Sequence, residues 1–481
     1  MRADKSCKPA LVFVLTQAGL GFLKRLAQEG GGAAFWRRRG VSKVDLYLHR
    51  EGSRPPDLEN LLQNMNQVLA SFAGMRLRLC GFPYCLLREN ILRYEYLVAN
   101  RETPGTFKPP FCSGCRFDRR CAGFPPAYKD SLLICGGKLA IPDRPVEILI
   151  EAETRCQFNC HFCFNQNTFA PDNTPAARNL MPALSGDAVK NIIDQISQWG
   201  VPKARFTGGE PLLRRDLLPL MDYAVDKGVG VWINTNGYQL RDQRLVRSVC
   251  ARAENILISL RGWDSDSDYG ESHIRGSFEL SCEAARALRA SGLKTLRIGI
   301  CATKSIIRNL DRLYEVVKGL AADRLEFYRP VVLHGKEHEL DAADLKILVD
   351  KLLDYQQAGD VNAYIANPLP FCFYEADKVN RVSLGAILGE GNNRFAVDPR
   401  GFCKPIYYMD VNMGDCRDLR AAWDSPFSRA IRNQELLPER CADCFYIGKC
   451  RGGSRHAARQ AFGDYRAPDP LATFNTVLPA G

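Results

Sequence analysis

From about Val146 onward, short apolar runs alternate with amphipathic helical segments, and this alternation constrains the fold more than any other feature of the chain. Alternating strand and helix signals are typical of a parallel sheet whose strands are joined by crossover helices. Six strand–helix units are too few for a closed eight-stranded barrel, so the sequence predicts an α/β fold with a partial (β/α)6 barrel. In such folds ligands bind at the carboxyl ends of the strands. The predicted strands are Val146–Ile150, Ala204–Thr207, Val229–Asn234, Asn255–Leu260, Thr295–Ile300 and Leu325–Tyr328, and the predicted helices are Asp187–Trp199, Leu217–Lys227, Arg241–Ala251, Phe278–Ala290 and Asn309–Leu320.

A strand–helix–strand succession occurs twice, once before the barrel and once at its end. Each copy ends in a Pro-aromatic-Cys sequence and is followed by the spacing Cys-x2-Cys-x5-Cys-x-Gly. Common building blocks explain the strands and helices but not two identical cysteine spacings, so we predict an internal repeat. The first copy is Val44–Leu48, Asp57–Phe72 and Arg76–Leu79, with Cys85, Cys112, Cys115 and Cys121; the second is Leu325–Tyr328, Asp344–Gln356 and Val361–Ile365, with Cys372, Cys441, Cys444 and Cys450.

The cysteines need a chemical explanation. The chain has 19 of them among 481 residues, well under the density of a disulfide scaffold, and it is long enough to bury a core without disulfides. The apolar stretch Leu11–Leu23 is too short to span a bilayer and is not followed by a small-residue cleavage site. We therefore predict a strand, Leu11–Leu15, that leads into a helix, and a cytoplasmic protein without membrane contact, in which cysteine clusters indicate metal ligands.

The most specific cysteine pattern is Cys-x3-Cys-x2-Cys, formed by Cys156, Cys160 and Cys163 directly after the first barrel strand. Three thiolates in one loop can bind a [4Fe–4S] cluster, which needs four ligands, so one iron would keep an open coordination position. Reactive sites keep such a position, whereas structural sites fill it. A zinc knuckle completed by His161 is disfavoured, because this histidine lies between two of the ligands.

This loop closely resembles that of the radical S-adenosylmethionine (SAM) superfamily. The resemblance includes Phe162, just before the third cysteine, and Gly208-Gly209-Glu210-Pro211 at the end of the second strand. It implies that SAM chelates the open iron, that Phe162 lies near the adenine and that Gly208, Gly209, Glu210 and Pro211 bind the SAM amino group. Glycines allow a close backbone approach to a ligand, and a carboxylate suits an ammonium group. Weaker matches are Asn236 in an Asn-Gly turn, Ser259 for a ribose or carboxylate contact, Ile300 against the adenine, and Tyr328 or Arg329 at the sixth strand.

The cysteines after the barrel resemble the SPASM extension or its shorter twitch form, which carries auxiliary iron–sulfur clusters. The run Asp398–Cys403 resembles the hairpin before a ligand cysteine, but Ser454 and Leu471 stand where SPASM domains have further cysteines. We therefore expect one auxiliary cluster at this end. Its ligands would be Cys441, Cys444 and Cys450, with a fourth from Cys372, as the repeat indicates, or from Cys403, as the hairpin indicates.

The repeat implies a second auxiliary site formed by Cys85, Cys112, Cys115 and Cys121, which could hold iron–sulfur or zinc. We expect the remaining cysteines to be small buried hydrophobes: Cys7, Cys80, Cys135, Cys250, Cys282, Cys301 and Cys416. The predicted domains are an N-terminal α/β region at 1–135, a radical SAM core at 136–335 and an auxiliary-cluster domain at 336–481.

The resemblance also implies the reaction. An electron from ferredoxin or flavodoxin would cleave SAM to methionine and a 5′-deoxyadenosyl radical, which abstracts hydrogen from the substrate. Auxiliary clusters in this superfamily commonly serve peptide and protein modification, so the predicted substrate is a peptide or protein side chain. A small molecule in cofactor or nucleoside biosynthesis is the alternative. No residue is assigned as the catalytic acid or base, and Asn165–Pro182 is a candidate lid.

A non-catalytic alternative is a zinc or iron–sulfur protein that binds nucleic acid or transfers electrons. The net charge of +11 favours nucleic-acid binding, but basic and aromatic residues are not interleaved as such binding needs. An electron-transfer protein would have no use for Gly208-Gly209-Glu210-Pro211.

Overall fold

The computed structural model describes most of the chain from residue 143 onward and the main elements before it. Its described residues form two compact units, one within Met1–Asp143 and Cys444–Lys449 and one within Arg144–Asp443 and Cys450–Thr476. The predicted three-domain division stays a prediction. The described positions are 11–28, 35, 38, 43–48, 55, 56, 58–72, 76–80, 82, 83, 86, 96–99, 106, 108, 109, 112, 115, 121, 123–125, 128, 143–160, 162, 163, 182–330, 340–359, 361–442, 444 and 446–473.

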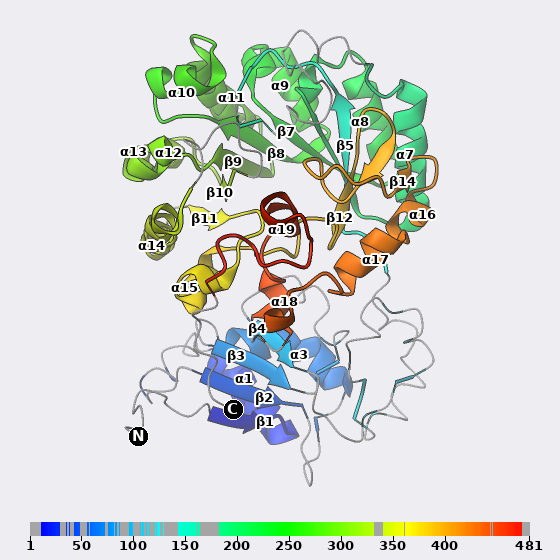
Figure 1. Ribbon diagram of the computed structural model, residues 1–481, viewed down its shortest axis with the longest axis vertical. Helices are drawn as coiled ribbons and strands as arrows, with labels where there is room; N and C mark the ends of the chain where they lie inside the picture. Colours follow the sequence, from blue (N-terminus) through cyan, green and yellow to red (C-terminus); the bar gives the residue numbers. More distant parts are fainter. Residues whose placement is uncertain are drawn as a thin grey trace. The chain divides into compact units, whose positions relative to one another are not determined.

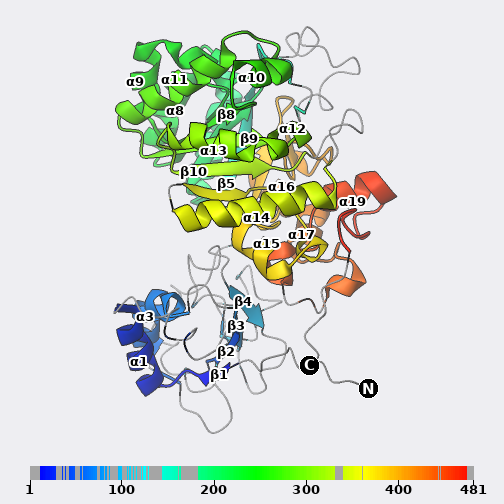
Figure 2. The ribbon, with the colours of Figure 1, turned by 90° about the vertical axis from the view of Figure 1, so that its left-hand side faces the viewer.

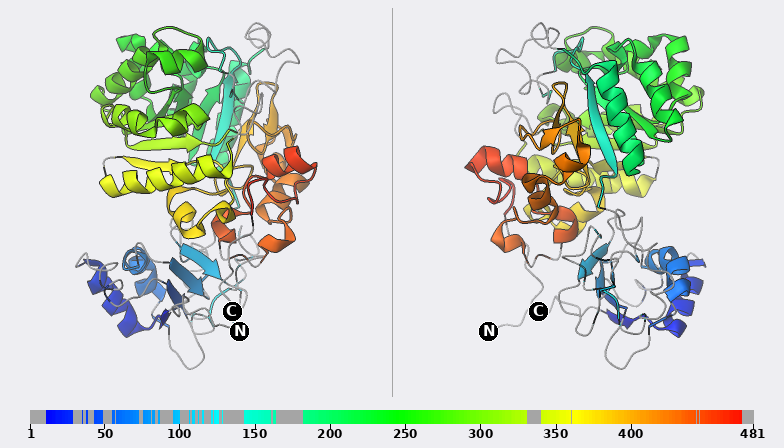
Figure 3. Two further views of the ribbon diagram at one scale, coloured as in Figure 1. Left: turned by 60° about the vertical axis from the view of Figure 1, so that its left-hand side comes forward. Right: turned by 90° about the vertical axis from the view of Figure 1, so that its right-hand side faces the viewer.

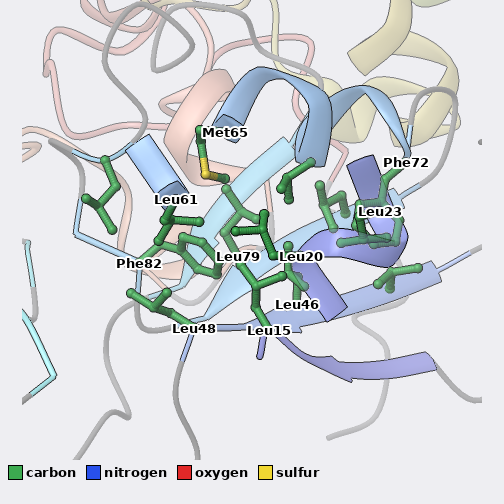
Figure 4. Packing of buried hydrophobic residues seen from close by; sticks show 14 of the residues in the cluster. Leu15, Leu20, Leu23, Leu46, Leu48, Leu61, Met65, Phe72, Leu79 and Phe82 are labelled. Atoms are coloured by element: carbon green, nitrogen blue, oxygen red, sulfur yellow. The ribbon is translucent and has the colours of Figure 1, made fainter. Parts of the chain in front are cut away.

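The N-terminal unit is a parallel four-stranded sheet with the strand order β1-β2-β3-β4. The predicted strand at its start and the strand–helix–strand succession of the first repeat copy are confirmed. Four completely buried leucines pack between the sheet and its helices: Leu20, Leu46, Leu61 and Leu79 (Figure 4). The elements are β1 (Leu11–Val14), α1 (Gln17–Gln28), β2 (Lys43–Tyr47), α3 (Leu58–Ala70), β3 (Arg76–Cys80) and β4 (Tyr96–Ala99).

The second unit contains the partial barrel, whose six central strands are parallel and follow one another in chain order, β5 to β10. All six predicted strands are confirmed. Helices cover the outer face of the strands (Figure 1), and Figure 2 looks onto α13 and α14. The strands are β5 (Glu147–Glu153), β6 (Lys203–Gly208), β7 (Gly230–Thr235), β8 (Ala253–Leu260), β9 (Thr295–Cys301) and β10 (Arg324–Tyr328), and the helices are α7 (Gly186–Trp199), α8 (Leu217–Asp226), α9 (Gln243–Cys250), α10 (Ser265–Ser272), α11 (Ser277–Ala290), α12 (Lys304–Arg308) and α13 (Leu310–Lys318).

Helix caps explain where the structure differs from the predicted helices. The predicted helix Arg241–Ala251 is divided into a 3-10 turn, η7 (Tyr238–Arg241), and α9, because the Asp242 side chain accepts a hydrogen bond from the Arg244 N–H at 2.8 Å and starts a new helix. The short helix α10 was not predicted because its residues are polar all round, and it is stabilised by a capping box at Asp264.

Two additions extend the barrel sheet beyond its six strands. On one edge, α14 (Ala342–Ala358) and β11 (Asn362–Ile365) complete the predicted second repeat copy, with β11 parallel to β10. On the other edge, β12 (Arg394–Val397) pairs in parallel with β5. β13 (Phe402–Lys404) and β14 (Gly414–Asp415) continue from β12 as antiparallel strands (Figure 3). The predicted hairpin Asp398–Cys403 therefore joins β12 to β13, directly beside the strand that leads to the cysteine loop.

Alternate residues of the barrel strands carry a buried ion-pair network on the face opposite the apolar residues. Arg205 and Arg394 both donate to the Glu147 carboxylate, at 2.7 Å each. Arg297 pairs with Glu326 at 2.9 Å, and Asn234 accepts from both Arg205 and Arg297 at 3.1 Å. Nearby guanidinium groups lower the pKa of Glu326 to about 2 in spite of its burial. The interior of the barrel is thus polar but internally paired.

Short helices follow β11 in the C-terminal part of the chain. They are α15 (Ala376–Val382), α16 (Leu419–Trp423), α17 (Pro426–Arg432), α18 (Ile447–Cys450) and α19 (Arg455–Phe462). In the described part of the chain no helix is long and apolar enough to cross a membrane.

Candidate active site

The cysteine loop begins where β5 ends. Cys156, Cys160 and Cys163 are each partly buried, and the Cys163 N–H donates to the Cys160 carbonyl at 3.1 Å. Burial raises the pKa of the Cys160 thiol well above its usual range, and the neighbouring Cys163 and Cys156 raise it further. The three sulfur atoms are therefore close enough to repel one another as thiolates, which a bound cation would relieve.

The Gly-Gly-Glu-Pro turn at the end of β6 is docked against the chain that leads into this loop. The Gly209 N–H donates to the Glu153 carbonyl at 2.7 Å, and the Glu210 N–H donates to the Arg155 carbonyl at 2.8 Å. A Cβ atom on Gly208 would lie 2.2 Å from the Glu153 carbonyl oxygen, and Gly208 has φ = 131°. Any side chain there is excluded. Besides their predicted role in SAM binding, these glycines therefore allow the Gly-Gly-Glu-Pro turn to pack directly against the chain that leads into the cysteine loop.

Glu210 is 1 % exposed and is held in a fixed orientation. Its carboxylate accepts from the Leu212 N–H at 3.0 Å, the Thr235 hydroxyl at 2.6 Å and the Asn236 N–H at 2.8 Å. Burial raises its pKa to about 7, against these hydrogen bonds and the charge of Arg261. A buried carboxylate with this pKa is poised to accept an ammonium group, which would restore its ionised form.

Asn236 connects the two motifs. Its side-chain N–H lies 3.9 Å from the Cys156 sulfur, and its side-chain oxygen accepts from Gln157 at 3.1 Å and from the Tyr238 N–H at 2.9 Å. Because its backbone N–H also donates to Glu210, one residue joins the cysteine loop to the carboxylate. Three thiols and one carboxylate thus lie at the carboxyl ends of β5 to β7, the end at which partial barrels bind ligands.

The family model described as the radical SAM superfamily matches residues 151–347, which span this site. Residues 151–347 are a radical SAM domain. The chain is accordingly a radical SAM enzyme, which disfavours the non-catalytic alternatives. The donor set of the domain fits the [4Fe–4S] cluster and SAM that the family uses, since one loop carries three thiols and is linked through Asn236 to an ammonium-accepting carboxylate.

Known proteins similar to this chain include two kinds of relative. The AdoMet-dependent heme synthase of Methanosarcina barkeri is 24 % identical over 354 residues, which cover 70 % of this chain and 98 % of the relative. The PqqA peptide cyclase of Ruegeria pomeroyi is 24 % identical over 336 residues, covering 68 % of this chain and 87 % of the relative.

Solved structures agree with the radical SAM fold. SuiB of Streptococcus suis bound to S-adenosylmethionine aligns with a TM-score of 0.56 and 19 % identity, over 72 % of this chain and 80 % of SuiB. The structure of anSMEcpe with bound AdoMet aligns with a TM-score of 0.53 and 15 % identity, over 68 % of this chain and 93 % of that protein. At these identities the likeness establishes the fold.

The remaining predicted SAM contacts stay predictions, and the structure adds a reason to doubt one of them. Side chains alternate along a strand, and Ile300 lies on the opposite face from Arg297, which belongs to the polar network. Cys301 shares the face of Arg297; burial raises the pKa of its thiol, and the nearby Glu271, Cys160 and Cys163 raise it further. Cys301 rather than Ile300 therefore faces the cysteine loop. Phe162, Pro211 and Ser259 are described without a contact that decides their role, and Asn165–Met181 lies outside the described residues.

Tyr328 and Arg329 are both engaged within the protein. The Tyr328 hydroxyl donates to Glu326 at 2.6 Å, and Arg329 forms an ion pair with Asp469 at 2.8 Å. Arg329 thereby ties the end of β10 to the C-terminal segment. The sequence did not indicate this pairing, because the two residues are 140 positions apart.

The sequence did not identify Glu151 either. This residue is completely buried on β5, and neither of its carboxyl oxygens has a hydrogen-bond partner among the residues that the structure describes. Burial raises its pKa to about 8 against the charge of Lys404, which favours the protonated form of the carboxyl. A hydrophobic run gives no signal that one of its members is a buried acid.

The candidate ligands of the C-terminal auxiliary site separate into two neighbourhoods. The Cys450 sulfur accepts a hydrogen bond from the Phe371 N–H at 3.4 Å, so it lies beside the turn that carries Cys372. Cys403 is completely buried on β13, where the nearby Cys416 raises the pKa of its thiol further. Cys416, which no motif singled out, is thus the described thiol that accompanies Cys403.

The first copy is described at Cys112, Cys115 and Cys121, while Cys85 lies outside the described residues. The Cys115 N–H donates to the Cys112 carbonyl at 2.9 Å, and the Gly123 N–H lies 3.4 Å from the Cys121 sulfur. Among the described residues, no group of three or more Cys, His, Asp or Glu side chains is placed so that it could hold a single metal ion. The ligand sets of both auxiliary sites stay predictions.

Proposed function

We propose that this radical SAM enzyme cleaves SAM reductively and modifies a side chain of a peptide or protein by hydrogen abstraction. The observation that carries the proposal is the hydrogen-bonded link from the cysteine loop through Asn236 to Glu210. This link holds the proposed cluster ligands and the proposed SAM carboxylate in one rigid unit.

Each part of the unit has a role that follows from its chemistry. When bound, the [4Fe–4S] cluster and SAM supply a 5′-deoxyadenosyl radical that removes a hydrogen atom from the substrate. Cys156, Cys160 and Cys163 hold the cluster, and Glu210 accepts the ammonium group of SAM. Because the pKa of Glu210 is about 7 before SAM binds, its ionised form increases as the pH rises through 7, and SAM affinity should rise with it.

The proposal includes two auxiliary clusters, one for each repeat copy. The first would use Cys85, Cys112, Cys115 and Cys121, and the second Cys372, Cys441, Cys444 and Cys450. The contact between Cys450 and the Phe371 N–H supports Cys372 over Cys403 as the fourth ligand. Ferredoxin or flavodoxin is the proposed electron donor, and a cytoplasmic location goes with it.

The substrate class is supported by similar proteins with peptide substrates or ligands. One structure of similar fold is SuiB bound to the precursor peptide SuiA, with a TM-score of 0.55, and another is anSMEcpe with bound AdoMet and the Cp18Cys peptide, with a TM-score of 0.51. The PqqA peptide cyclase is a further relative. The second candidate is a small molecule in cofactor synthesis, favoured by heme synthase relatives that the alignment covers almost entirely, at 98 % in one case.

One anaerobic experiment tests the reaction and another the substrate. The reconstituted protein with SAM and dithionite should release 5′-deoxyadenosine, and C160A should not; no release from the wild type would refute the proposal. Adding peptides encoded by short reading frames beside the gene should then increase the release and change the mass of one peptide. An increase with a tetrapyrrole, and none with peptides, would replace the peptide by the small-molecule candidate.

A further inference from the structure

A buried ion pair lies directly behind the cysteine loop and has no part in the function proposed above. Arg261 follows β8 and is 4 % exposed, and Asp268 lies on α10 and is completely buried. The Arg261 side chain donates to the Asp268 carboxylate at 3.2 Å. The backbone N–H of Arg261 also donates to Asp268, at 3.3 Å, so the backbone and the side chain of Arg261 bind the same carboxylate oxygen.

Arg261 contacts the cysteine loop through an aromatic ring. Its guanidinium carbon lies 4.3 Å from the centre of the Phe158 ring, and Phe158 stands between the first two cysteines of the loop. Phe158 is 2 % exposed and packs edge-on against Tyr238 at 5.9 Å. A cation over a desolvated ring is an attractive contact, so Arg261 holds the loop as well as facing it.

A second contact ties Arg261 to the SAM side of the site. Arg261 donates to the Ser281 hydroxyl at 3.2 Å, and this hydroxyl donates to the Asn236 carbonyl at 2.8 Å. Asn236 is the residue that joins Cys156 to Glu210. The position of Arg261 is therefore fixed relative to both the proposed cluster ligands and the proposed SAM carboxylate.

The two charges of the pair relate differently to the cysteine loop. Arg261 contacts the loop through the Phe158 ring, and Asp268 is bound to Arg261. Two further carboxyl groups interact with the charge of Arg261: Glu210, and Glu271 on α10. A fixed charge in a buried place acts on a nearby cluster with little screening by solvent.

We propose that the Arg261–Asp268 pair sets the reduction potential of the cluster held by Cys156, Cys160 and Cys163, with Arg261 raising the potential and Asp268 lowering it. Reduction adds negative charge to the cluster, and nearby charges are among the factors that set its potential. Arg261 is thus a positioning residue, which acts on the cluster through the loop that would hold it. The inference rests on the proposed function, because it needs a cluster in this loop.

The test is an EPR-monitored redox titration of the reconstituted full-length protein under anaerobic conditions. The core cluster is recognised as the signal that changes when SAM is added. R261Q should lower the midpoint potential and D268N should raise it. A tenfold change in the ratio of reduced to oxidised cluster, the size expected for each variant, corresponds to 59 mV for one electron. R261K should stay near the wild type, because the charge is kept.

Opposite shifts are a result that general damage to the fold does not produce. The matched control is R312Q, which removes a 62 % exposed arginine paired with Asp264 next to α10 and should leave the potential unchanged. Shifts of the same sign in R261Q and D268N, or no shift in either, overturn the inference. If R261Q fails to bind iron, the expected rise of the midpoint potential in D268N tests the inference by itself. A wild-type protein without a SAM-sensitive cluster signal refutes the proposed function instead.

Discussion

The two repeat copies share a backbone design but differ in what surrounds it. In each copy a strand, a helix and a second, parallel strand are followed by a cysteine whose N–H donates to the carbonyl of a proline three residues earlier, Pro109 to Cys112 and Pro438 to Cys441, both at 2.9 Å. The glycine that closes each motif has a left-handed backbone, with φ = 89° at Gly123 and 76° at Gly452. Even the first strands correspond, as Lys-Val-Asp-Leu-Tyr and Arg-Leu-Glu-Phe-Tyr.

The difference lies in the sheets. The first copy belongs to a sheet of four strands with an apolar core, whereas the second copy extends the barrel sheet and adds Glu326 and Tyr364 to the polar network. Both copies bury apolar side chains, and the second copy also carries buried ion pairs. The predictions below test whether the copies are alike in their metal sites and different in their stability.

The largest expected effect is the loss of a whole cluster. C121A and C450A replace corresponding cysteines, and each should lose about four of about 12 irons, since three clusters of four are expected. Iron, sulfide and zinc analysis measures this. C282A, at a buried cysteine of α11 outside the motifs, is the control and should keep all the iron. Zinc in the wild type that disappears only in C121A would show that the copies hold different metals.

A smaller effect distinguishes the fourth ligand of the second copy. C372A should lose most of the iron that C450A loses, because the Cys450 sulfur lies beside the turn that carries Cys372. C403A should keep this iron, since Cys403 lies with Cys416 in the hairpin. Iron content and the EPR signal are measured side by side for the two variants. Loss in C403A with retention in C372A would contradict the correspondence between the copies.

The stability of the second copy should depend on an ion pair. E326Q leaves Arg297 buried without its counter-charge, which costs about 3–5 kcal/mol. The folded-state pKa of Glu326, about 2, is below its ordinary value of 4.5, so the stabilisation is fully present above pH 4.5 and is lost as the pH falls towards 2. Hydrogen exchange of β10 and β11 should therefore differ between wild type and E326Q at pH 7. An equal exchange rate in both proteins would show that the ion pair does not stabilise these strands.

The first copy should show a somewhat smaller effect without this pH dependence. L46A removes a completely buried side chain between the sheet and its helices and should cost about 2–4 kcal/mol. Exchange in β2 and β3 should increase by the same factor at pH 7 and at pH 5, because no charge is involved. A pH-dependent increase would mean that polar groups, and not apolar packing, stabilise this copy.

The sequence predicted the elements better than their partners. All six barrel strands and both repeat copies were predicted because their periodicity is local. The pairing of β12 with β5 was not, since nothing in Arg394–Val397 indicates which strand it joins. At the site, the cysteine loop, Glu210 and Asn236 were found from motifs. Arg261 and Asp268 were missed because a buried ion pair is recognisable only when both residues are placed in three dimensions.

The pairing of β12 with β5 also bears on how the protein receives its cluster. β5 is hydrogen-bonded on both sides, to β6 and to β12, so it cannot slip by one residue. The start of the cysteine loop that follows β5 is therefore fixed in position before any iron is bound. An assembly protein that delivers a cluster would meet a preformed loop, and maturation would need no refolding of the barrel. The hairpin of β12 and β13, which pairs with β5 through β12, would thus help to form a site to which it contributes no ligand.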